Sequence, residues 1–203
     1  MIEGVIFDMG GVLLRTVNPL PREKMAERFG TTCKELERVV FLSESSLRSE
    51  VGEISAEDHW KFVLHHFDQK EINPMKAYDE FFSGDVLDKE LLKFITGLRK
   101  HYKFGLLSNA WVDARYHVEK TYSFLDAFDV SVFSYELRIR KPDRKIFEYI
   151  LDKLRLLPEQ AVFVDDFIEN VEGARSLGMM GIHFINTFDT VKELNRLLRS
   201  ASK

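Results

Sequence analysis

Val5-Ile6-Phe7-Asp8-Met9-Gly10-Gly11-Val12-Leu13 is the stretch of sequence on which the fold depends. Its first three residues are β-branched or aromatic, and a continuous apolar run of this kind is typical of a strand buried in a parallel sheet. Asp8 then lies at the carboxyl end of the strand, which is the edge of open α/β sheets where ligands bind. Gly10 and Gly11 let the backbone turn tightly and bring its N–H groups close to an anion. The same residues are also compatible with a capping aspartate followed by an ordinary turn.

After residue 88 the sequence alternates between short apolar strands and amphipathic helices. Strands are expected at residues 104–107, 129–133, 161–164 and 180–184. Helices are expected at residues 91–99, 146–154, 168–177 and 191–198. Strands that alternate with helices indicate a parallel sheet covered by helices on both faces, so the fold class is α/β.

The segment between the first strand and this alternating part is helical. From about residue 21 to residue 82 it is rich in helix formers at helical spacing, and Ser55 is expected to cap a helix that follows it. The simplest organisation is an α/β core of residues 1–14 and 85–203, with residues 15–84 inserted as a helical domain. Since the insertion directly follows the loop after Asp8, it is placed to act as a lid over that loop.

Length and composition exclude several classes of protein. The chain has 203 residues, a formal net charge of −4 and one cysteine, Cys33, so an intrachain disulfide is impossible. Without a basic stripe, nucleic acid is not the expected partner. No apolar run is long enough to span a bilayer, and the first residues lack a leader pattern, so we expect a cytoplasmic protein without membrane contact. The oligomeric state cannot be read from the sequence.

Histidines gather near residues 59–66, but their pattern does not define a metal site. His59, His65 and His66 lack further ligands at suitable spacing, so we interpret them as packing or solvated histidines.

Polar side chains follow three of the predicted strands at the points where these strands end. They are Asp8, Ser108 with Asn109, and Asp165 with Asp166, and Lys141 joins them from a loop before a helix. Each could be a turn or capping residue on its own. Because the carboxyl ends of parallel strands share one edge, we expect all of them to converge there.

This set of residues can bind a metal ion and a phosphate group together. Three carboxylates repel one another unless a cation is present, and hard oxygen ligands suit Mg²⁺. Magnesium, a lysine, a serine hydroxyl and the amides of the glycine loop would form a pocket for a phosphate dianion. Asp8 could then attack a phosphoryl group and form an aspartyl-phosphate that water hydrolyses.

Four segments, taken in order, resemble the four motifs of the haloacid dehalogenase-like hydrolase superfamily. They are FDMGGVL with Asp8, LLSN with Ser108, RKPD with Lys141, and VFVDDFIENVEGA with Asp165 and Asp166. The resemblance covers the α/β part of the chain. It implies subfamily IA, a Rossmann-like core, an inserted helical cap of the C1 type and catalysis through an aspartyl ester.

The resemblance also implies which residues hold the metal. Asp8 would be the nucleophile, and it would hold Mg²⁺ together with the Gly10 carbonyl and Asp165. Asp166 would assist directly or through water, and Asn170 would orient the metal-binding loop.

A second group of residues would bind the substrate. By the resemblance, Ser108 and Lys141 bind the transferring phosphoryl group, with the Asn109 amide beside them. The backbone of Gly10 and Gly11 would lie against the same group.

Within the superfamily, residues 135–178 and 52–55 are most similar to bacterial sugar-phosphate phosphatases of the α-D-glucose-1-phosphate phosphatase type. The sequence therefore predicts a Mg²⁺-dependent phosphatase that hydrolyses a small phosphorylated metabolite, such as an anomeric sugar 1-phosphate.

The chain departs from the family pattern at two positions. Most phosphatases of the superfamily have a second aspartate two residues after the nucleophile, acting as general acid and base, and here that position is Gly10. Either the substrate has a good leaving group, or the cap supplies the acid, with Glu53 as the first candidate. Arg138 stands where relatives often have glycine, and we expect it to face solvent.

Two other functions remain open from the sequence. A 2-haloacid dehalogenase would use the same Asp8 without a metal, but the pair Asp165-Asp166 would repel an anionic acid substrate. A non-catalytic binding or regulatory protein on the same scaffold is the other alternative, since fold does not fix function.

Overall fold

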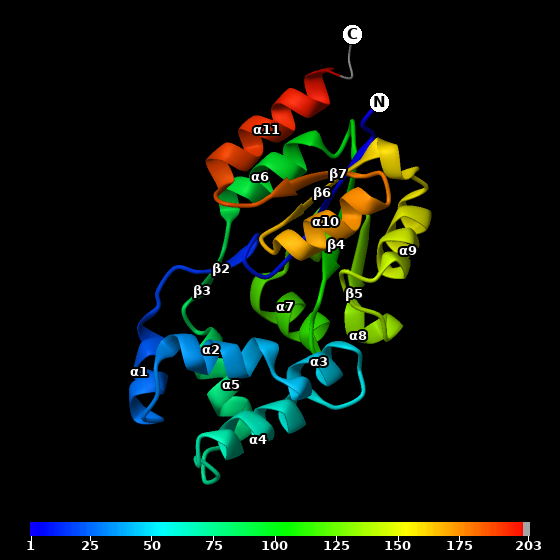
Figure 1. The fold of residues 1–203 in the computed structure, drawn as a ribbon. Helices are drawn as coiled ribbons and strands as arrows, with labels where there is room; N and C mark the ends of the chain where they lie inside the picture. Colours follow the sequence, from blue (N-terminus) through cyan, green and yellow to red (C-terminus); the bar gives the residue numbers. More distant parts are fainter. Residues whose placement is uncertain (201–203) are drawn as a thin grey trace.

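The computed structural model describes residues 1–200, with side chains as far as residue 198. Across these residues, five parallel strands form one sheet in the order β5-β4-β1-β6-β7 (Figure 1). The strands are β1 (Gly4–Phe7), β4 (Lys103–Ser108), β5 (Val130–Phe133), β6 (Ala161–Asp165) and β7 (Met180–His183). β1 is central, because Phe7 pairs with Leu106 of β4 on one side and with Val164 of β6 on the other. The predicted parallel sheet is therefore confirmed.

Helices cover both faces of this sheet, as the α/β pattern predicts. One face carries α6 (Lys89–Leu98), α7 (Ala114–Tyr122) and α11 (Thr187–Ser200), and the other carries α9 (Arg144–Leu154) and α10 (Ile168–Ser176) (Figure 1). Alternate side chains of a strand point to opposite faces. Val5 and Phe7 accordingly pack in one hydrophobic cluster, and Ile6 packs in the other.

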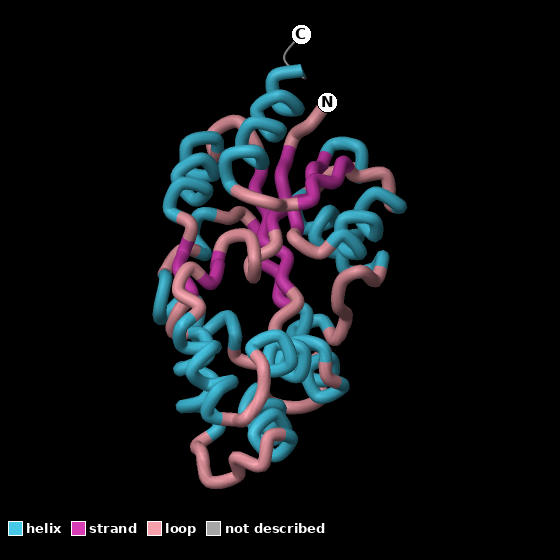
Figure 2. The backbone as a smooth tube through the Cα atoms, turned by 60° about the vertical axis from the view of Figure 1, so that its left-hand side comes forward, coloured by secondary structure: helices cyan, strands magenta, loops and turns pink. Residues whose placement is uncertain are grey.

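Residues 20–82 form the helical part of the molecule. Its helices are α1 (Leu20–Arg28), α2 (Cys33–Leu42), α3 (Glu44–Glu50), α4 (Ala56–His66) and α5 (Pro74–Phe82). They surround a separate hydrophobic cluster, which includes the fully buried Trp60 and Phe81 and which Trp111 of the sheet part joins. Ser55 caps α4 as expected, because its hydroxyl accepts a hydrogen bond from the Asp58 N–H at 3.0 Å. The helices lie beyond the carboxyl ends of the strands (Figures 1 and 2).

A short antiparallel ribbon connects the helical part to the sheet part. Its strands are β2 (Leu14–Thr16) and β3 (Asp85–Leu87), and Arg15 of β2 pairs with Asp88, the residue after β3. Sequence patterns do not predict this ribbon, because its strands are only three residues long and far apart in the chain. The two crossings between the parts therefore lie side by side.

The last elements differ slightly from the expected bounds. The final helix begins at Thr187 rather than at residue 191, and the final strand ends at His183 rather than at residue 184. No helix in the described residues is long and apolar enough to cross a membrane.

Candidate active site

Three neighbouring strands deliver polar side chains to the same edge of the sheet. Asp8 directly follows β1, Ser108 ends β4 and Asp165 ends β6. The Asp8 N–H donates to the Val164 carbonyl at 2.8 Å, which extends the pairing of β1 and β6 by one residue. Lys141 reaches this edge from the loop between α8 (Ser134–Leu137) and α9. The structure therefore brings together the side chains that the sequence pattern predicts to converge.

The Lys141 ammonium joins two of the carboxylates. Its Nζ lies 2.7 Å from Asp8 Oδ1 and 2.6 Å from Asp165 Oδ2. Lys141 is 1 % exposed and Asp165 is fully buried. A buried charge is stable only when it is paired and hydrogen-bonded. Burial opposes the charged form of Lys141, but the fields of Asp8 and Asp165 raise the pKa of the lysine.

Asp8, Asp165 and Asp166 form a group with the composition of a divalent cation site. Each offers one carboxylate oxygen, and these oxygens lie within 4.8 Å of one another. Burial raises the pKa of Asp8 well above its usual value against the opposing field of Lys141, and Asp165 and Asp166 raise it further. One ammonium therefore does not neutralise the three carboxylates, and hard oxygen ligands of this kind fit Mg²⁺.

Asp166 carries the clearest sign of a missing partner. Its Oδ1 is buried without a hydrogen-bond partner in the described structure. Burial, followed by the charge of Asp165, raises the pKa of Asp166 to about 6. An unpaired buried carboxylate oxygen is unfavourable unless a cation or donor arrives to meet it.

The loop that carries Asp165 is held by the start of α10. The Asn170 amide donates to both oxygens of Asp165 at 3.1 Å, and the Phe167 N–H donates to Asp165 Oδ1 at 2.8 Å. This placement supports the orienting role that the resemblance implies for Asn170.

The two glycines that follow Asp8 in the same loop have different environments. Gly11 has φ +77°, and a Cβ there would overlap the Asp166 carboxylate. A side chain at Gly11 would therefore strain the backbone and displace Asp166. At Gly10 a Cβ would meet nothing within 4 Å, so the backbone has room for a side chain.

Asn109 and Lys141 lock two loops together. The Lys141 N–H donates to Asn109 Oδ1 at 2.8 Å, and Asn109 Nδ2 donates back to the Lys141 carbonyl at 3.0 Å. Ser108 is buried beside them, at the end of β4. Lys141 therefore has both its side chain and its backbone fixed.

Glu53, the first candidate for an acid from the cap, lies away from this group. Its side chain is 58 % exposed and pairs with Arg48. Glu50 is the carboxylate that faces the sheet part, because its Oε2 lies 2.5 Å from Arg140 Nε, next to Lys141. Neither Glu50 nor Arg140 is predicted from the sequence to have a role at the site, although Arg140 lies within the RKPD segment.

Arg138 and the histidines are placed as expected. Arg138 is exposed at φ +57°, a backbone region that glycine adopts readily. His59 is buried and hydrogen-bonded to Ser45, and His65 and His66 are exposed. The one candidate metal cluster found among the described residues contains no histidine.

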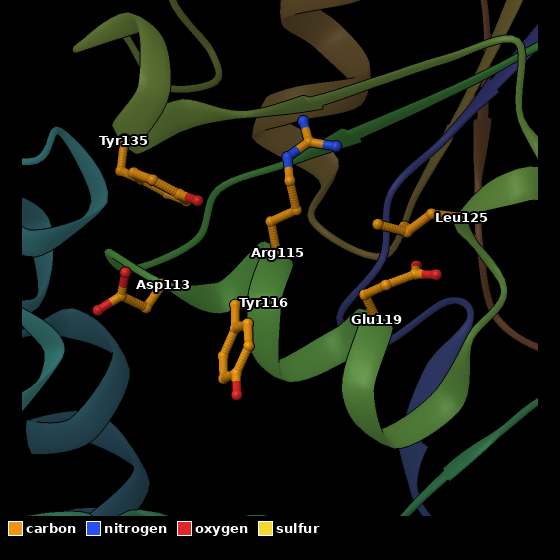
Figure 3. Close-up of a pocket in the computed structure, with 6 residues that line it drawn as sticks. All are labelled: Asp113, Arg115, Tyr116, Glu119, Leu125 and Tyr135. Carbon is orange, nitrogen blue, oxygen red and sulfur yellow. The ribbon is translucent and has the colours of Figure 1, made fainter.

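A separate pocket of about 470 Å³ lies beside α7 (Figure 3). Its lining residues are Asp113, Arg115, Tyr116, Glu119, Leu125 and Tyr135. None of them belongs to the carboxylate and lysine group. The Arg115 guanidinium is already engaged by the Glu136 carboxylate.

Two curated proteins of similar sequence are phosphatases that match most of the chain. D-ribitol-5-phosphate phosphatase from Bacteroides thetaiotaomicron is 27% identical, over 98% of this chain and 100% of the relative. Phosphorylated carbohydrates phosphatase from Thermotoga maritima is 29% identical, over 90% of this chain and 84% of the relative.

Solved structures share the fold. A HAD family enzyme from Bacteroides thetaiotaomicron, in complex with magnesium and inorganic phosphate, superimposes with a TM-score of 0.74 at 23% identity, over 90% of this chain and 93% of the other. The family model of haloacid dehalogenase-like hydrolases matches residues 2–178. With its four motifs gathered around one buried lysine, the chain belongs to the haloacid dehalogenase-like hydrolases.

Proposed function

We propose that the protein is a Mg²⁺-dependent phosphatase that hydrolyses a small sugar or polyol phosphate through an aspartyl-phosphate on Asp8. The observation that carries this proposal is the buried Asp8–Lys141–Asp165 group with the unpaired oxygen of Asp166 beside it. Such a group has one nucleophile, one fixed ammonium and an excess of carboxylate charge.

Asp8, Asp165 and Asp166, with the Gly10 carbonyl, would hold the magnesium ion. When bound, the ion supplies positive charge that offsets the carboxylates and the phosphoryl oxygens. The unpaired Asp166 Oδ1 and the excess of carboxylates support this assignment on chemical grounds.

The residues of the chain carry the steps of the reaction. An Asp8 oxygen forms a bond to phosphorus while the bond from phosphorus to the ester oxygen breaks, and the leaving oxygen takes up a proton. Lys141 and Ser108 donate hydrogen bonds to the phosphoryl oxygens, and Asn109 holds Lys141 in place. Water then attacks the aspartyl-phosphate, which releases inorganic phosphate and restores Asp8.

The substrate class is proposed from the relatives and from Gly10. The names of the two curated relatives refer to ribitol 5-phosphate and to phosphorylated carbohydrates. Gly10 has no proton to donate, so substrates with better leaving groups should react faster. We therefore expect the protein to hydrolyse anomeric sugar phosphates faster than primary alkyl phosphates.

We further propose that residues 15–84 act as a cap on the core of residues 1–14 and 85–203. The helices lie beyond the carboxyl ends of the strands and pack around a separate hydrophobic cluster, to which the core contributes Trp111. The ribbon of β2 and β3 would act as the hinge between the two parts.

The test is phosphate release from a panel of sugar, polyol and nucleoside phosphates, with Mg²⁺ or with EDTA. We expect wild type to lose turnover in EDTA, Asp8→Asn to be inactive, and Asp152→Asn, an exposed carboxylate with the same change in charge, to retain wild-type rates. Turnover that survives Asp8→Asn or EDTA would refute the proposal.

The alternative reaction of this fold, dehalogenation, is not favoured by these relatives. The paired carboxylates Asp165 and Asp166 would repel a haloacid anion. Chloride release from 2-chloropropionate that persists in EDTA would nevertheless establish that reaction instead.

A further inference from the structure

Helix α3 carries several contacts between the helical part and the sheet part. Ser46 Oγ accepts a hydrogen bond from Trp111 Nε1 at 3.0 Å. The Glu50 carbonyl accepts one from the Ser134 hydroxyl at 2.6 Å, and Glu50 Oε2 pairs with Arg140 Nε. The partners lie on the segments that follow β4 and β5. α3 therefore docks on the two segments that also carry Asn109 and Lys141.

Glu50 is linked to both of these segments within one or two residues of the phosphate-binding side chains. Ser134, which donates to the Glu50 carbonyl, also accepts the Ala110 N–H at 3.0 Å, directly after Asn109. Arg140, which holds the Glu50 carboxylate, directly precedes Lys141. One residue of the helical part thus touches the supports of both Asn109 and Lys141.

The Glu50–Arg140 ion pair is partly buried, whereas the nearby Arg48–Glu53 pair is exposed to solvent. The Glu50 side chain is 12 % exposed. Burial raises the pKa of its carboxyl, while Arg140 and Lys141 act in the opposite direction, so Glu50 also feels the charge of Lys141. Removing one partner of a sheltered ion pair has large effects, whereas an exposed pair such as Arg48–Glu53 contributes little.

Gly52 tightens the same contact. It has φ +71°, and a Cβ on it would lie 2.8 Å from the Tyr135 carbonyl. The backbone after α3 therefore approaches the backbone after Ser134 more closely than a residue with a side chain allows.

We propose that Glu50 is a positioning residue for phosphoryl transfer, acting through Arg140 and Ser134 to set the placement of Lys141 and Asn109 when α3 is docked. The inference rests on the proposed phosphatase function. Since Glu50 serves the phosphoryl group rather than the leaving group, its loss should affect every phosphoester alike. The phosphate site is complete only in the docked arrangement.

The test compares Glu50→Gln with Glu53→Gln on two substrates, p-nitrophenyl phosphate and glucose 1-phosphate. Glutamine retains the backbone carbonyl and the shape of Glu50 but removes the charge that holds Arg140. We expect kcat to fall about 10-fold or more on both substrates, since small misplacements of reacting groups have effects of this size. Glu53→Gln should retain wild-type values, because its exposed pair lies away from the site.

A double-mutant cycle shows whether Glu50 acts through Arg140. Arg140→Gln removes the same ion pair from its more exposed partner. If Glu50→Gln does not fold, Arg140→Gln alone still tests the role of the pair. We expect the double variant to lose no more than the larger single loss, because coupled residues are not additive. The inhibition constant of inorganic phosphate should rise by a similar factor in each variant.

Other outcomes overturn the inference. A loss confined to glucose 1-phosphate would show that Glu50 contacts the leaving group instead, and a loss that grows with the pKa of the leaving group would show a proton donor. If the fold losses in kcat of the two single variants multiply in the double variant, Glu50 and Arg140 act independently of each other. Wild-type rates in Glu50→Gln would refute the positioning role alone, whereas an inactive wild type would refute the phosphatase function as well.

Discussion

Asp166→Asn should stabilise the metal-free protein at alkaline pH. In wild type, the ionised Asp166 carboxylate is buried beside Asp165 with one oxygen unpaired. Burial first, and Asp165 second, raise its pKa from the usual 3.8 to about 6. A folded-state pKa above the unfolded value means that ionised Asp166 destabilises the fold.

The magnitude follows from this difference in pKa. At about 1.4 kcal/mol per pH unit, the rise to about 6 corresponds to about 3 kcal/mol. Because Asp166 is only partly buried, solvent screening reduces this to about 2 kcal/mol. The destabilisation is fully present above pH 6 and disappears as the pH falls below 3.8. Wild type and variant should therefore differ most at pH 8 and converge at acid pH.

The assay is urea unfolding in EDTA at pH 8 and pH 5, with Asp152→Asn as a control for the loss of one exposed negative charge. We expect the free energy of unfolding of Asp166→Asn to exceed that of wild type by about 2 kcal/mol at pH 8. The melting temperature should be higher by about 4–8 °C. Saturating Mg²⁺ should stabilise wild type more than the variant, which has one ligand fewer. A variant less stable than wild type in EDTA at pH 8, or a difference independent of pH, would refute the reasoning.

Three further changes test other parts of the structure. Burial lowers the pKa of His59 to about 4, so this histidine takes up a proton at higher pH in the unfolded chain than in the folded one. Between pH 8 and pH 5, the free energy of unfolding, measured in urea, should therefore fall by about 2 kcal/mol more for wild type than for His59→Asn. Gly11→Ala, whose Cβ would overlap Asp166, should lower kcat at least about tenfold and require more Mg²⁺ for saturation, whereas Gly97→Ala, with open space around it, should retain activity. Gly10→Asp should raise kcat on primary alkyl phosphates about 100-fold, with p-nitrophenyl phosphate unchanged, because the backbone there has room for the missing acid.

The parallel sheet and the gathering of its site residues could be predicted because the position of the site follows from one rule. Parallel strands end at one edge, so Asp8, Ser108 and Asp165 meet there whatever the details of the loops. The apolar runs before these residues are nearly continuous, which identifies strands buried on both faces. The roles of the site residues came from the resemblance and remain predictions.

The position of α3 against the sheet part could not be predicted, because the buried residues of this helix are polar. Ser45, Ser46 and Ser49 are the buried residues of α3, and serine gives no hydrophobic periodicity by which to orient a helix. Glu50 and Glu53 are the same residue type, three positions apart in the sequence. Only the end of α3 after Glu50 places one of them against Arg140 and the other in solvent.

The sequence does not distinguish the two aspartates at the end of β6, but they differ in their hydrogen bonds. Both oxygens of Asp165 are already engaged, by Lys141, Asn170 and the Phe167 N–H. Asp166 Oδ1 has no such partner. A cation bound by Asp165 would therefore share that carboxylate with Lys141. A cation bound by Asp166 Oδ1 would not have to break an existing hydrogen bond. Because Lys141 also pairs with Asp8, we expect metal binding to change the position of the lysine. When a cation binds Asp8 and Asp165, the Lys141 ammonium is expected to turn toward the phosphoryl oxygens.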